Sequence, residues 1–453
     1  MNNLYVGYAS TNINPPLGIS VAGYYVPRYA KGFLDDLEAS ATVIAAEDKK
    51  AVIVSVDHCG LDKKTVAEIV EAAEKRTGIS KDNMFIHSTH THTGPSISLP
   101  SFPADAEQIE TYRQFLVTRV ADVIELAAGD LKPARMGYIT GYAPERVAYI
   151  RRYKMKDGTT WTCPPIDDPN IDHPIGVLDQ RVNVVRFDRE GAQTVVIVNY
   201  GLHSDTINGE LISADWPGWM RKTLDKALDG VKCVFLNGCE GDVGSTNVHP
   251  KDGDMNDTEI SFDNEMKSPG MARFVGRAIA GTVLQVYDKV KYVDVDSIDM
   301  IKRTAKIAAN VPKPEDMPRA KEYKKLHESG RDDLIPYTAM ELTTVVAEAL
   351  RMCKHEFGPE YFDLELCGIR LGEIALLGIP GEPFTDIGVG IKESRAFALT
   401  LPCALVNGSE GYFPMQSAFD EGGYEARTSR FKAGVAENII KEGKALLEEL
   451  KNR

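Results

Sequence analysis

The chain has 453 residues, of which 43% are hydrophobic and 26% charged, a composition typical of a folded protein large enough to bury an extensive core. Lysine and arginine number 52 against 66 aspartates and glutamates, so the net charge is −14, which argues against binding to nucleic acid or anionic lipid. The seven cysteines are an odd number without a CxxC pair, which favours free thiols in a reducing compartment over disulfides or a thiolate metal site.

No apolar run approaches the roughly 20 residues that a membrane-spanning helix needs. The first residues also lack the basic and apolar stretches of a secretory signal. We therefore expect a cytoplasmic protein that acts on a small-molecule substrate, without nucleic acid and without stable membrane association. The composition leaves the oligomeric state open.

Strand-like and helix-like segments alternate along the chain, the pattern of an α/β or mixed α+β fold. Runs of apolar and β-branched residues predict strands at 50–57, 84–90, 181–187, 193–200, 233–236 and 364–379. Apolar residues at helical spacing predict helices at 65–76, 104–128, 217–228, 270–287 and 431–450. The more charged stretch 301–357 is a candidate helical insertion. Because no linker or repeat interrupts the chain, we expect one large catalytic domain over residues 1–453, with β-sheets flanked by helices.

The histidine pair in His90-Thr91-His92 is the first candidate for chemistry, and it follows the predicted strand 84–90. In an extended chain, residues i and i+2 share one face and lie roughly 6–7 Å apart, so both rings can face one cleft. Either both histidines bind a metal ion, or one binds it while the other contacts the substrate or the bound water. A hydrogen-bonded structural pair is the alternative. His87 points to the opposite face, and we expect it to be structural.

Two further candidates follow other predicted strands. His203 comes directly after the strand 193–200, at the edge where α/β sheets place ligands. Glu382 lies between Pro380 and Pro383 after the strand 364–379, and it is a candidate metal ligand, general base or turn residue. Spacing alone does not join these residues into one site.

The segments that contain the candidate site residues, taken in chain order, resemble those of the neutral ceramidase family, the neutral/alkaline non-lysosomal ceramidases. The segments that carry the resemblance are the opening 6–24, His90-Thr91-His92 with Gly94-Pro95, the strand that ends in His203, Asn237-Gly238-Cys239-Glu240-Gly241-Asp242-Val243, Pro380-Gly381-Glu382-Pro383-Phe384-Thr385 and Gly411-Tyr412. Their order and approximate spacing hold over nearly the whole chain, and the opening fits the N-terminal catalytic domain of that family.

The resemblance implies a Zn²⁺ ion as cofactor, with four protein ligands. By motif, these are His90, His203, Glu382 and Tyr412. Imidazole, carboxylate and phenolate form a sensible set for a borderline metal ion.

The resemblance also implies catalytic roles for His92, Arg151 and Tyr424. His92 would face the substrate or the metal-bound water, while Arg151 and Tyr424 occupy the positions of the family's arginine and second tyrosine. In such a site water activated by the metal attacks the scissile bond.

One position departs from the family pattern. Ceramidases carry a serine after Gly-Asp-Val, but here that position is Gly244, and Ser245 is shifted by one. The chain also ends near Arg453, without room for the further β-domain of secreted ceramidases. We therefore expect zinc-dependent hydrolysis of an amide bond in a soluble, non-ceramide substrate. An ester or lactone hydrolase, a lyase or isomerase acting on a sugar-like substrate, and a non-catalytic metal-binding protein are the alternatives.

Overall fold

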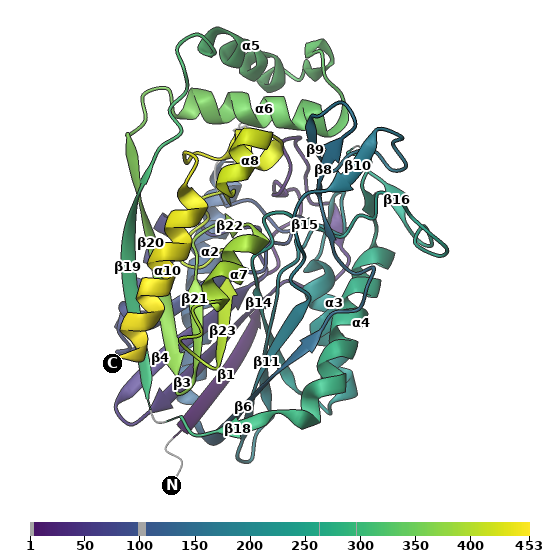
Figure 1. Ribbon diagram of the computed structural model, residues 1–453. Coiled ribbons are helices and arrows are strands. Elements are labelled where there is room, and N and C mark those ends of the chain that lie inside the picture. Colours follow the sequence, from purple (N-terminus) through teal and green to yellow (C-terminus); the bar gives the residue numbers. More distant parts are fainter. Residues whose placement is uncertain (1–3, 98–105, 262, 296) are drawn as a thin grey trace.

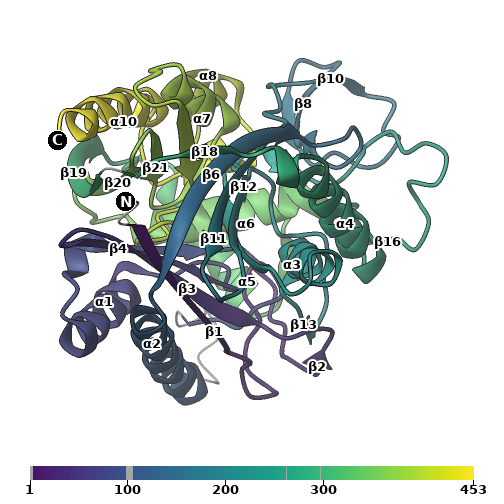
Figure 2. The same ribbon diagram turned by 90° about the horizontal axis from the view of Figure 1, so that it is seen from below.

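Two β-sheets pack face to face in the computed structural model, and helices cover both outer faces (Figure 1, Figure 2). The structure describes residues 4–97, 106–261, 263–295 and 297–453. This four-layer α/β/β/α arrangement confirms the predicted mixed α/β class.

The larger sheet runs in the order β14-β12-β11-β6-β1-β3-β4-β5, and β18 adds to β6. Its strands are β1 (Leu4–Asn12), β3 (Glu38–Ala46), β4 (Lys49–Val56), β5 (Met84–Ser88), β6 (Lys132–Tyr142), β11 (Arg181–Arg189), β12 (Val195–Tyr200), β14 (Lys232–Asn237) and β18 (Lys291–Val293). The β4–β5 and β12–β14 pairs are parallel and the other neighbours are antiparallel. Consequently β5, β12 and β14 each end next to a parallel neighbour. The loop that follows each of these strands carries residues of the candidate site.

The smaller sheet runs in the order β19-β20-β21-β23. Its strands are β19 (Ile298–Ala308), β20 (Tyr361–Leu371), β21 (Ile374–Gly378) and β23 (Leu399–Cys403). The two sheets also meet at their ends, where the Ala404 N–H donates to the Asn237 carbonyl (3.0 Å) and the Ser88 N–H donates to the Leu405 carbonyl (3.2 Å). These bonds bring the ends of strands from both sheets to one place.

Helices α1 (Lys63–Thr77) and α2 (Ala106–Gly129) cover one half of the larger sheet, and α3 (Asp215–Ala227) and α4 (Pro269–Val286) cover the other half (Figure 2). Helices α7 (Thr385–Lys392) and α10 (Val435–Lys451) cover the smaller sheet. Helices α5 (Met317–Glu328) and α6 (Ala339–Lys354) lie together at the end of the molecule opposite the chain termini (Figure 1).

Short elements complete the chain between these layers. They are β2 (Gly32–Phe33), β7 (Tyr149–Ile150), β8 (Arg152–Met155), β9 (Thr160–Thr162), β10 (Ile171–Pro174), β13 (Leu211–Ile212), β15 (Val243–Gly244), β16 (Glu259–Ile260), β17 (Met266–Lys267), β22 (Glu382–Pro383), β24 (Tyr412–Phe413), α8 (Gln416–Glu421) and α9 (Tyr424–Thr428). Several of them surround the candidate site.

Strands buried on both faces explain the continuous apolar runs in the sequence. In β3, Val43 packs under α1 and α2, whereas its neighbour Ile44 faces the smaller sheet. The same alternation along β4 places Val52 and Val54 under the helices and Ile53 between the sheets. Each of these strands therefore contributes to two cores, one under the helices and one between the sheets. For this reason polar residues do not alternate with apolar ones in their sequences.

Most predicted elements are confirmed, with small shifts at their ends, and two are wrong in part. The predicted strand 364–379 is the hairpin of β20 and β21, because the chain turns at Gly372, whose φ is 56°. The candidate helical insertion 301–357 contains α5 and α6, but Ile301–Ala308 belongs to strand β19. Residues 104 and 105 of the predicted helix 104–128 lie outside the described residues.

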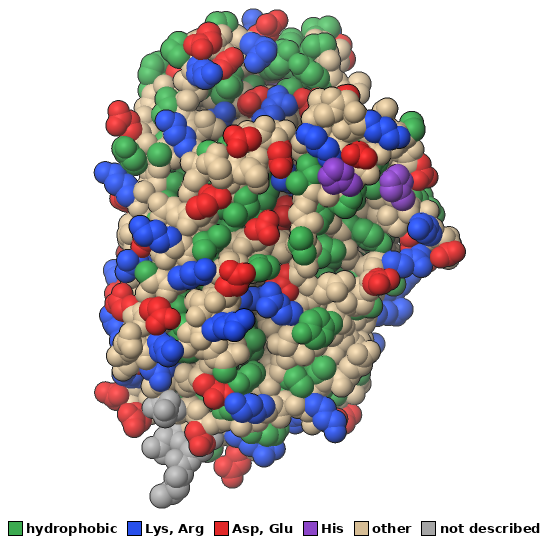
Figure 3. Space-filling model, viewed as in Figure 1, with side chains coloured by type: hydrophobic (Ala, Val, Ile, Leu, Met, Phe, Trp, Pro, Cys, Tyr) green, Lys and Arg blue, Asp and Glu red, His purple; other side chains and the backbone are tan. Residues whose placement is uncertain are grey.

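All seven cysteines are free, as predicted. Among the described residues, no helix combines the length and apolar character needed to span a membrane. Figure 3 shows acidic and basic side chains interspersed over one face of the molecule rather than gathered into a basic patch.

Candidate metal centre

The metal ligands predicted from the sequence lie together where strands of both sheets end. His90 follows β5, and His203 follows β12. Glu382 and Tyr412 come from β22 and β24, which pair in parallel with Glu382 directly opposite Tyr412. All four residues are at least nine-tenths buried. The structure therefore brings together the complete ligand set that the ceramidase resemblance implied.

The histidine pair has a different backbone from the extended one that we predicted. Strand β5 ends at Ser88, and His90 has a left-handed φ of 69°. This tight turn folds the two rings toward each other, so that the Nε2 atoms of His90 and His92 are 3.2 Å apart. His87 remains in the strand, where its Nε2 accepts the Asn237 N–H (2.8 Å), and its predicted structural role is confirmed.

Close backbone approaches place Glu382 beside these histidines. The Gly241 N–H donates to the Pro383 carbonyl, and a Cβ at Gly241 would lie only 2.5 Å from the Glu382 carbonyl oxygen. Glycine at this position therefore allows the loop after β14 to press against β22. The Glu382 N–H in turn donates to the Gly411 carbonyl, next to Tyr412.

The ligand atoms form a compact group. Glu382 Oε2 lies 3.3 Å from His90 Nε2 and 3.4 Å from His203 Nε2. The Tyr412 hydroxyl lies 3.4 Å from His203 Nε2. Four ligands at about 2.0–2.1 Å from Zn²⁺ in tetrahedral geometry are separated by about 3.3–3.4 Å. The spacing of these atoms fits such an ion.

Backbone carbonyls set the orientation of both histidine rings. His90 Nδ1 is 2.6 Å from the Cys59 carbonyl oxygen, and His203 Nδ1 is 2.8 Å from the Glu240 carbonyl oxygen. Carbonyls only accept hydrogen bonds, so Nδ1 carries the proton in each ring and the Nε2 lone pair faces the ligand group. This is the tautomer that a metal ion requires.

The charges within the group also favour a cation. Burial would raise the pKa of Glu382, but His90 and His203 bring it well below its ordinary value. Burial would lower the pKa of His90, but Glu382 and Cys59 raise it well above its ordinary value. For His203, burial and the Arg151 guanidinium lower the pKa to about 4. The buried carboxylate thus requires one positive charge beside it, which a proton on His90 or a metal ion can supply. Glu382 Oε2 faces His90 Nε2 and His203 Nε2, so an ion held by the two histidines would also lie beside this oxygen.

The three residues predicted to be catalytic surround the ligand group. Arg151 Nη1 is 3.3 Å from His203 Nε2, and its guanidinium lies 5.3 Å from the centre of the Tyr412 ring. The Tyr424 ring packs edge-on against the Tyr412 ring, with centroids 5.5 Å apart. His92 presents Nε2 to His90, while its Nδ1 makes no hydrogen bond and lies 3.6 Å from Asp205.

Sequence reasoning missed several residues that support this group. Glu425 is fully buried, and it accepts hydrogen bonds from Arg151 Nε (2.8 Å) and Thr162 (2.7 Å), which fixes the arginine. Asp205 accepts hydrogen bonds from Lys267 (2.7 Å) and Tyr24 (2.8 Å) beside His92. Their positions directly after Tyr424 and shortly after His203 are the signal that could have drawn attention to them.

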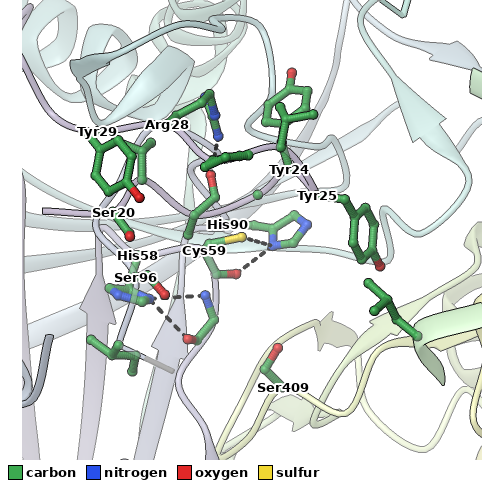
Figure 4. A pocket seen from close by; sticks show the side chains of 18 of the residues that line it. Ser20, Tyr24, Tyr25, Arg28, Tyr29, His58, Cys59, His90, Ser96 and Ser409 are labelled. Atoms are coloured by element: carbon green, nitrogen blue, oxygen red, sulfur yellow. Dashed lines mark hydrogen bonds between the residues drawn. The ribbon is translucent and has the colours of Figure 1, made fainter. Parts of the chain in front are cut away.

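A cavity of about 390 Å³ opens next to the ligand group, and His90 and Glu382 belong to its lining. Figure 4 shows the His90 ring beside Cys59, with Tyr25 and Ser409 also lining the cavity. Much of the wall is polar, with side chains of Arg28, His58 and several serines and tyrosines. The group of potential ligands is therefore open to a small molecule on this side.

Gly244, at the position of the family serine, pairs with Tyr149 in the short β7–β15 ladder. A Cβ at Gly244 would lie 3.7 Å from Arg151 Cβ, so this position borders the site. Ser245 is buried but lines a separate pocket between α4 and the loop 253–258, which does not include the ligand group. The one-residue shift thus moves the hydroxyl away from the site.

Known structures with the same arrangement of elements identify the fold. The chain is similar to the crystal structure of neutral ceramidase from Pseudomonas aeruginosa, with a TM-score of 0.72 and 16% identity, over 100% of this chain and 75% of that chain. A ceramidase complexed with C2 gives a TM-score of 0.73 and 17% identity, over 100% of this chain and 76% of that chain. The fold is that of the neutral ceramidases. No family model matches the sequence. Because one fold supports many activities, the function has to be argued from the site.

Proposed function

We propose that the protein is a zinc-dependent hydrolase that cleaves an amide bond in a soluble substrate. The observation that carries this proposal is the convergence of His90 Nε2, His203 Nε2, Glu382 Oε2 and the Tyr412 hydroxyl, with neighbouring atoms 3.3–3.4 Å apart. The neutral ceramidase fold, which is the fold of a hydrolase, supports the same class of reaction.

The donor set favours zinc over harder cations. Two imidazoles, one carboxylate and one phenol provide nitrogen and oxygen ligands, whereas Mg²⁺ and Ca²⁺ prefer oxygen ligands alone. A zinc ion held here would supply a Lewis acid, which acidifies water and polarises a carbonyl group.

The surrounding side chains have distinct tasks in this proposal. Arg151 is held by Glu425 and presents its guanidinium at the ligand group, where it can steady negative charge on the scissile carbonyl oxygen. A fixed donor in such a position contributes about 3–4 kcal/mol of transition-state stabilisation. His92 Nε2 can accept a proton and deliver it to the leaving group, and the Tyr424 hydroxyl orients the substrate.

The small cavity, whose lining is partly polar, supports a soluble amide rather than a long-chain ceramide as the substrate. Its volume of about 390 Å³ lies at the small end of ligand pockets. Gly244 also offers no hydroxyl for a serine-based step. The opening at His90 and Glu382 favours a reacting centre over a closed structural metal site, in which all positions belong to the protein.

Metal analysis of purified variants tests the ligand set. The wild type is expected to contain one zinc per chain, whereas His90→Ala, His203→Ala and Glu382→Gln are expected to lose it, because each removes one ligand. His92→Ala should retain zinc and lose turnover if His92 transfers protons. His173→Ala is the matched control, since this histidine is 61% exposed and outside the site. Wild type without stoichiometric metal and indifferent to chelators would contradict the proposal.

The reaction class is tested with a panel of soluble amides, esters and lactones in heavy-oxygen water. Hydrolysis must place the label in the product acid, whereas a lyase or isomerase leaves the products unlabelled. Turnover of long-chain ceramide without turnover of any soluble amide would refute the proposed substrate.

A further inference from the structure

Helices α5 and α6 enclose a second hollow directly beside the cavity of the metal centre. This groove has a volume of about 540 Å³ and shares Tyr25, Val26 and His327 with the lining of that cavity. The shared residues make the two spaces neighbours along one path. A molecule bound at His90 and Glu382 can therefore extend under α6.

One face of α6 forms an apolar wall along this path. Leu342 and Val346 line the groove, and Leu350 lines the cavity at the metal centre. These residues recur at a spacing of four, so they lie on one side of the helix. They pack with Ile335 and Tyr25 into a small apolar cluster, apart from the cores of the two sheets.

Tyr25 stands at the junction of the two spaces, with its ring in the apolar cluster and its hydroxyl bonded to Tyr424. The Tyr424 ring in turn contacts Tyr412 of the ligand group. A short chain of contacts thus links the groove to the metal centre.

Ion pairs fix α6 relative to the site. Arg427, in the same short helix as Tyr424, contacts Glu341 and Glu348 on α6, each at 2.7 Å. Arg351 on α6 donates back to the Arg427 carbonyl (2.9 Å). The apolar wall is therefore held at a defined distance from Tyr424 and Tyr412.

We propose that the groove under α6 binds an apolar arm of the substrate, so that the substrate class is an N-acyl amide with a medium-length acyl chain on a small polar amine. This inference rests on the proposed hydrolase function. The polar amine portion occupies the cavity beside Arg28 and His58, and the acyl chain runs past Tyr25 along Leu342 and Val346. Asp332 and Asp333 line the groove as well, so a chain that ends in a methyl group is favoured over one that ends in a carboxylate.

The experiment compares N-acylglycines that differ only in their acetyl, butanoyl, octanoyl or dodecanoyl chain. Each methylene buried in an apolar groove strengthens binding about fourfold. We expect kcat/KM of the metal-loaded wild type to rise at least tenfold from acetyl to octanoyl, a conservative expectation given that factor. Leu342→Trp fills the groove and should abolish this rise, so that kcat/KM for octanoylglycine falls to the level measured for acetylglycine. Leu342→Ala lengthens the groove and should move the optimum to dodecanoyl.

Leu334→Trp is the matched control, because Leu334 is a leucine of the same segment, 52% exposed and absent from the groove lining. It should keep the wild-type preference. Equal rates for all chain lengths, or equal effects of both tryptophan variants, would overturn the groove proposal.

A binding measurement separates this proposal from the hydrolase proposal. Calorimetry with the Glu382→Gln variant should show octanoylglycine binding at least tenfold more tightly than acetylglycine, with the difference lost when Leu342→Trp is added. If this preference appears and the wild type cleaves no amide, the groove stands and the proposed reaction fails. If amides are cleaved and no binding preference appears, the groove fails and the reaction stands.

Discussion

His87 lies in β5, whereas His90 and His203 follow the buried strands β5 and β12, and the ring nitrogens of these histidines face different partners. His87 Nε2 accepts a backbone N–H of β14, so this lone pair is already used. In His90 and His203 the Nδ1 atoms meet carbonyls, so the Nε2 atoms face the group of proposed metal ligands. The partner of one ring nitrogen therefore decides whether the other can bind a metal.

This assignment predicts a specific pH dependence of stability. Burial and the charge of His90 lower the pKa of His87 to about 3, whereas an unfolded histidine titrates near 6.5. As the pH falls below 6.5, the unfolded chain binds a proton that the folded chain does not, so the free energy of unfolding decreases until the pH reaches about 3. Titration of His87 therefore lowers the free energy of unfolding at pH 5 by about 2 kcal/mol relative to its value above pH 6.5.

Urea unfolding of wild type and His87→Gln at pH 7 and pH 5 measures this contribution. Glutamine can accept the Asn237 N–H without titrating, so the variant should lose less stability between the two pH values, although it starts less stable at pH 7. His173→Ala controls for the loss of an exposed histidine. Parallel pH profiles of wild type and His87→Gln would contradict the neutral, accepting ring.

At the scale of elements, the site depends on the short pair β22–β24 and on the loop after β14 that presses against it. Gly241 has no room for a side chain, since a Cβ there would meet the Glu382 carbonyl oxygen at 2.5 Å. Gly244, three residues later in the same loop, has room, because its nearest neighbour would be 3.7 Å away. These two glycines form a natural comparison.

Gly241→Ala is expected to push β22 away from the loop and to lower the free energy of unfolding by about 1–3 kcal/mol. Because β22 carries Glu382, zinc content should fall as well. Gly244→Ala should change the free energy of unfolding by no more than about 0.5 kcal/mol. Its zinc content should equal that of the wild type. Circular dichroism, urea unfolding and metal analysis measure these effects, and identical behaviour of the two variants would refute the role of the close approach.

Sequence patterns could predict which residues belong to the site, but not how they meet. Glu382 and Tyr412 carried recognisable local motifs, whereas their pairing in β22 and β24 depends on strands too short to leave a periodic pattern. The left-handed turn at His90 was also hidden, because residues other than glycine rarely adopt a positive φ and no sequence pattern marked this one. The sequence did not predict strands such as β1, β3 and β6. Small and polar residues interrupt the apolar runs or the alternating pattern by which a strand is recognised.

At the scale of the whole molecule, zinc would connect the two sheets. His90 and His203 follow strands of the larger sheet, and Glu382 follows the smaller sheet. A ligand that binds only the folded state adds stability by mass action, about 2.7 kcal/mol at a hundredfold excess over its dissociation constant. Metal binding should therefore stabilise the packing of the two sheets.

Thermal unfolding at a fixed scan rate tests this connection. Zinc should raise the midpoint of wild type and chelators should lower it, while Glu382→Gln should respond to neither. His173→Ala should respond like the wild type. A midpoint of wild type that zinc and chelators leave unchanged would show that no ion joins the sheets.

The meeting of strand ends from both sheets has a consequence for biogenesis. His90 leaves the ribosome long before Tyr412, and any chain that ends before Tyr412 lacks at least one of the proposed ligands. Metal uptake by the full ligand set can then occur only after the chain has been made past Tyr412 and the two sheets have docked. Only chains in which both sheets have assembled would bind the ion. Chains that stall or misassemble would remain without metal and accessible to proteases.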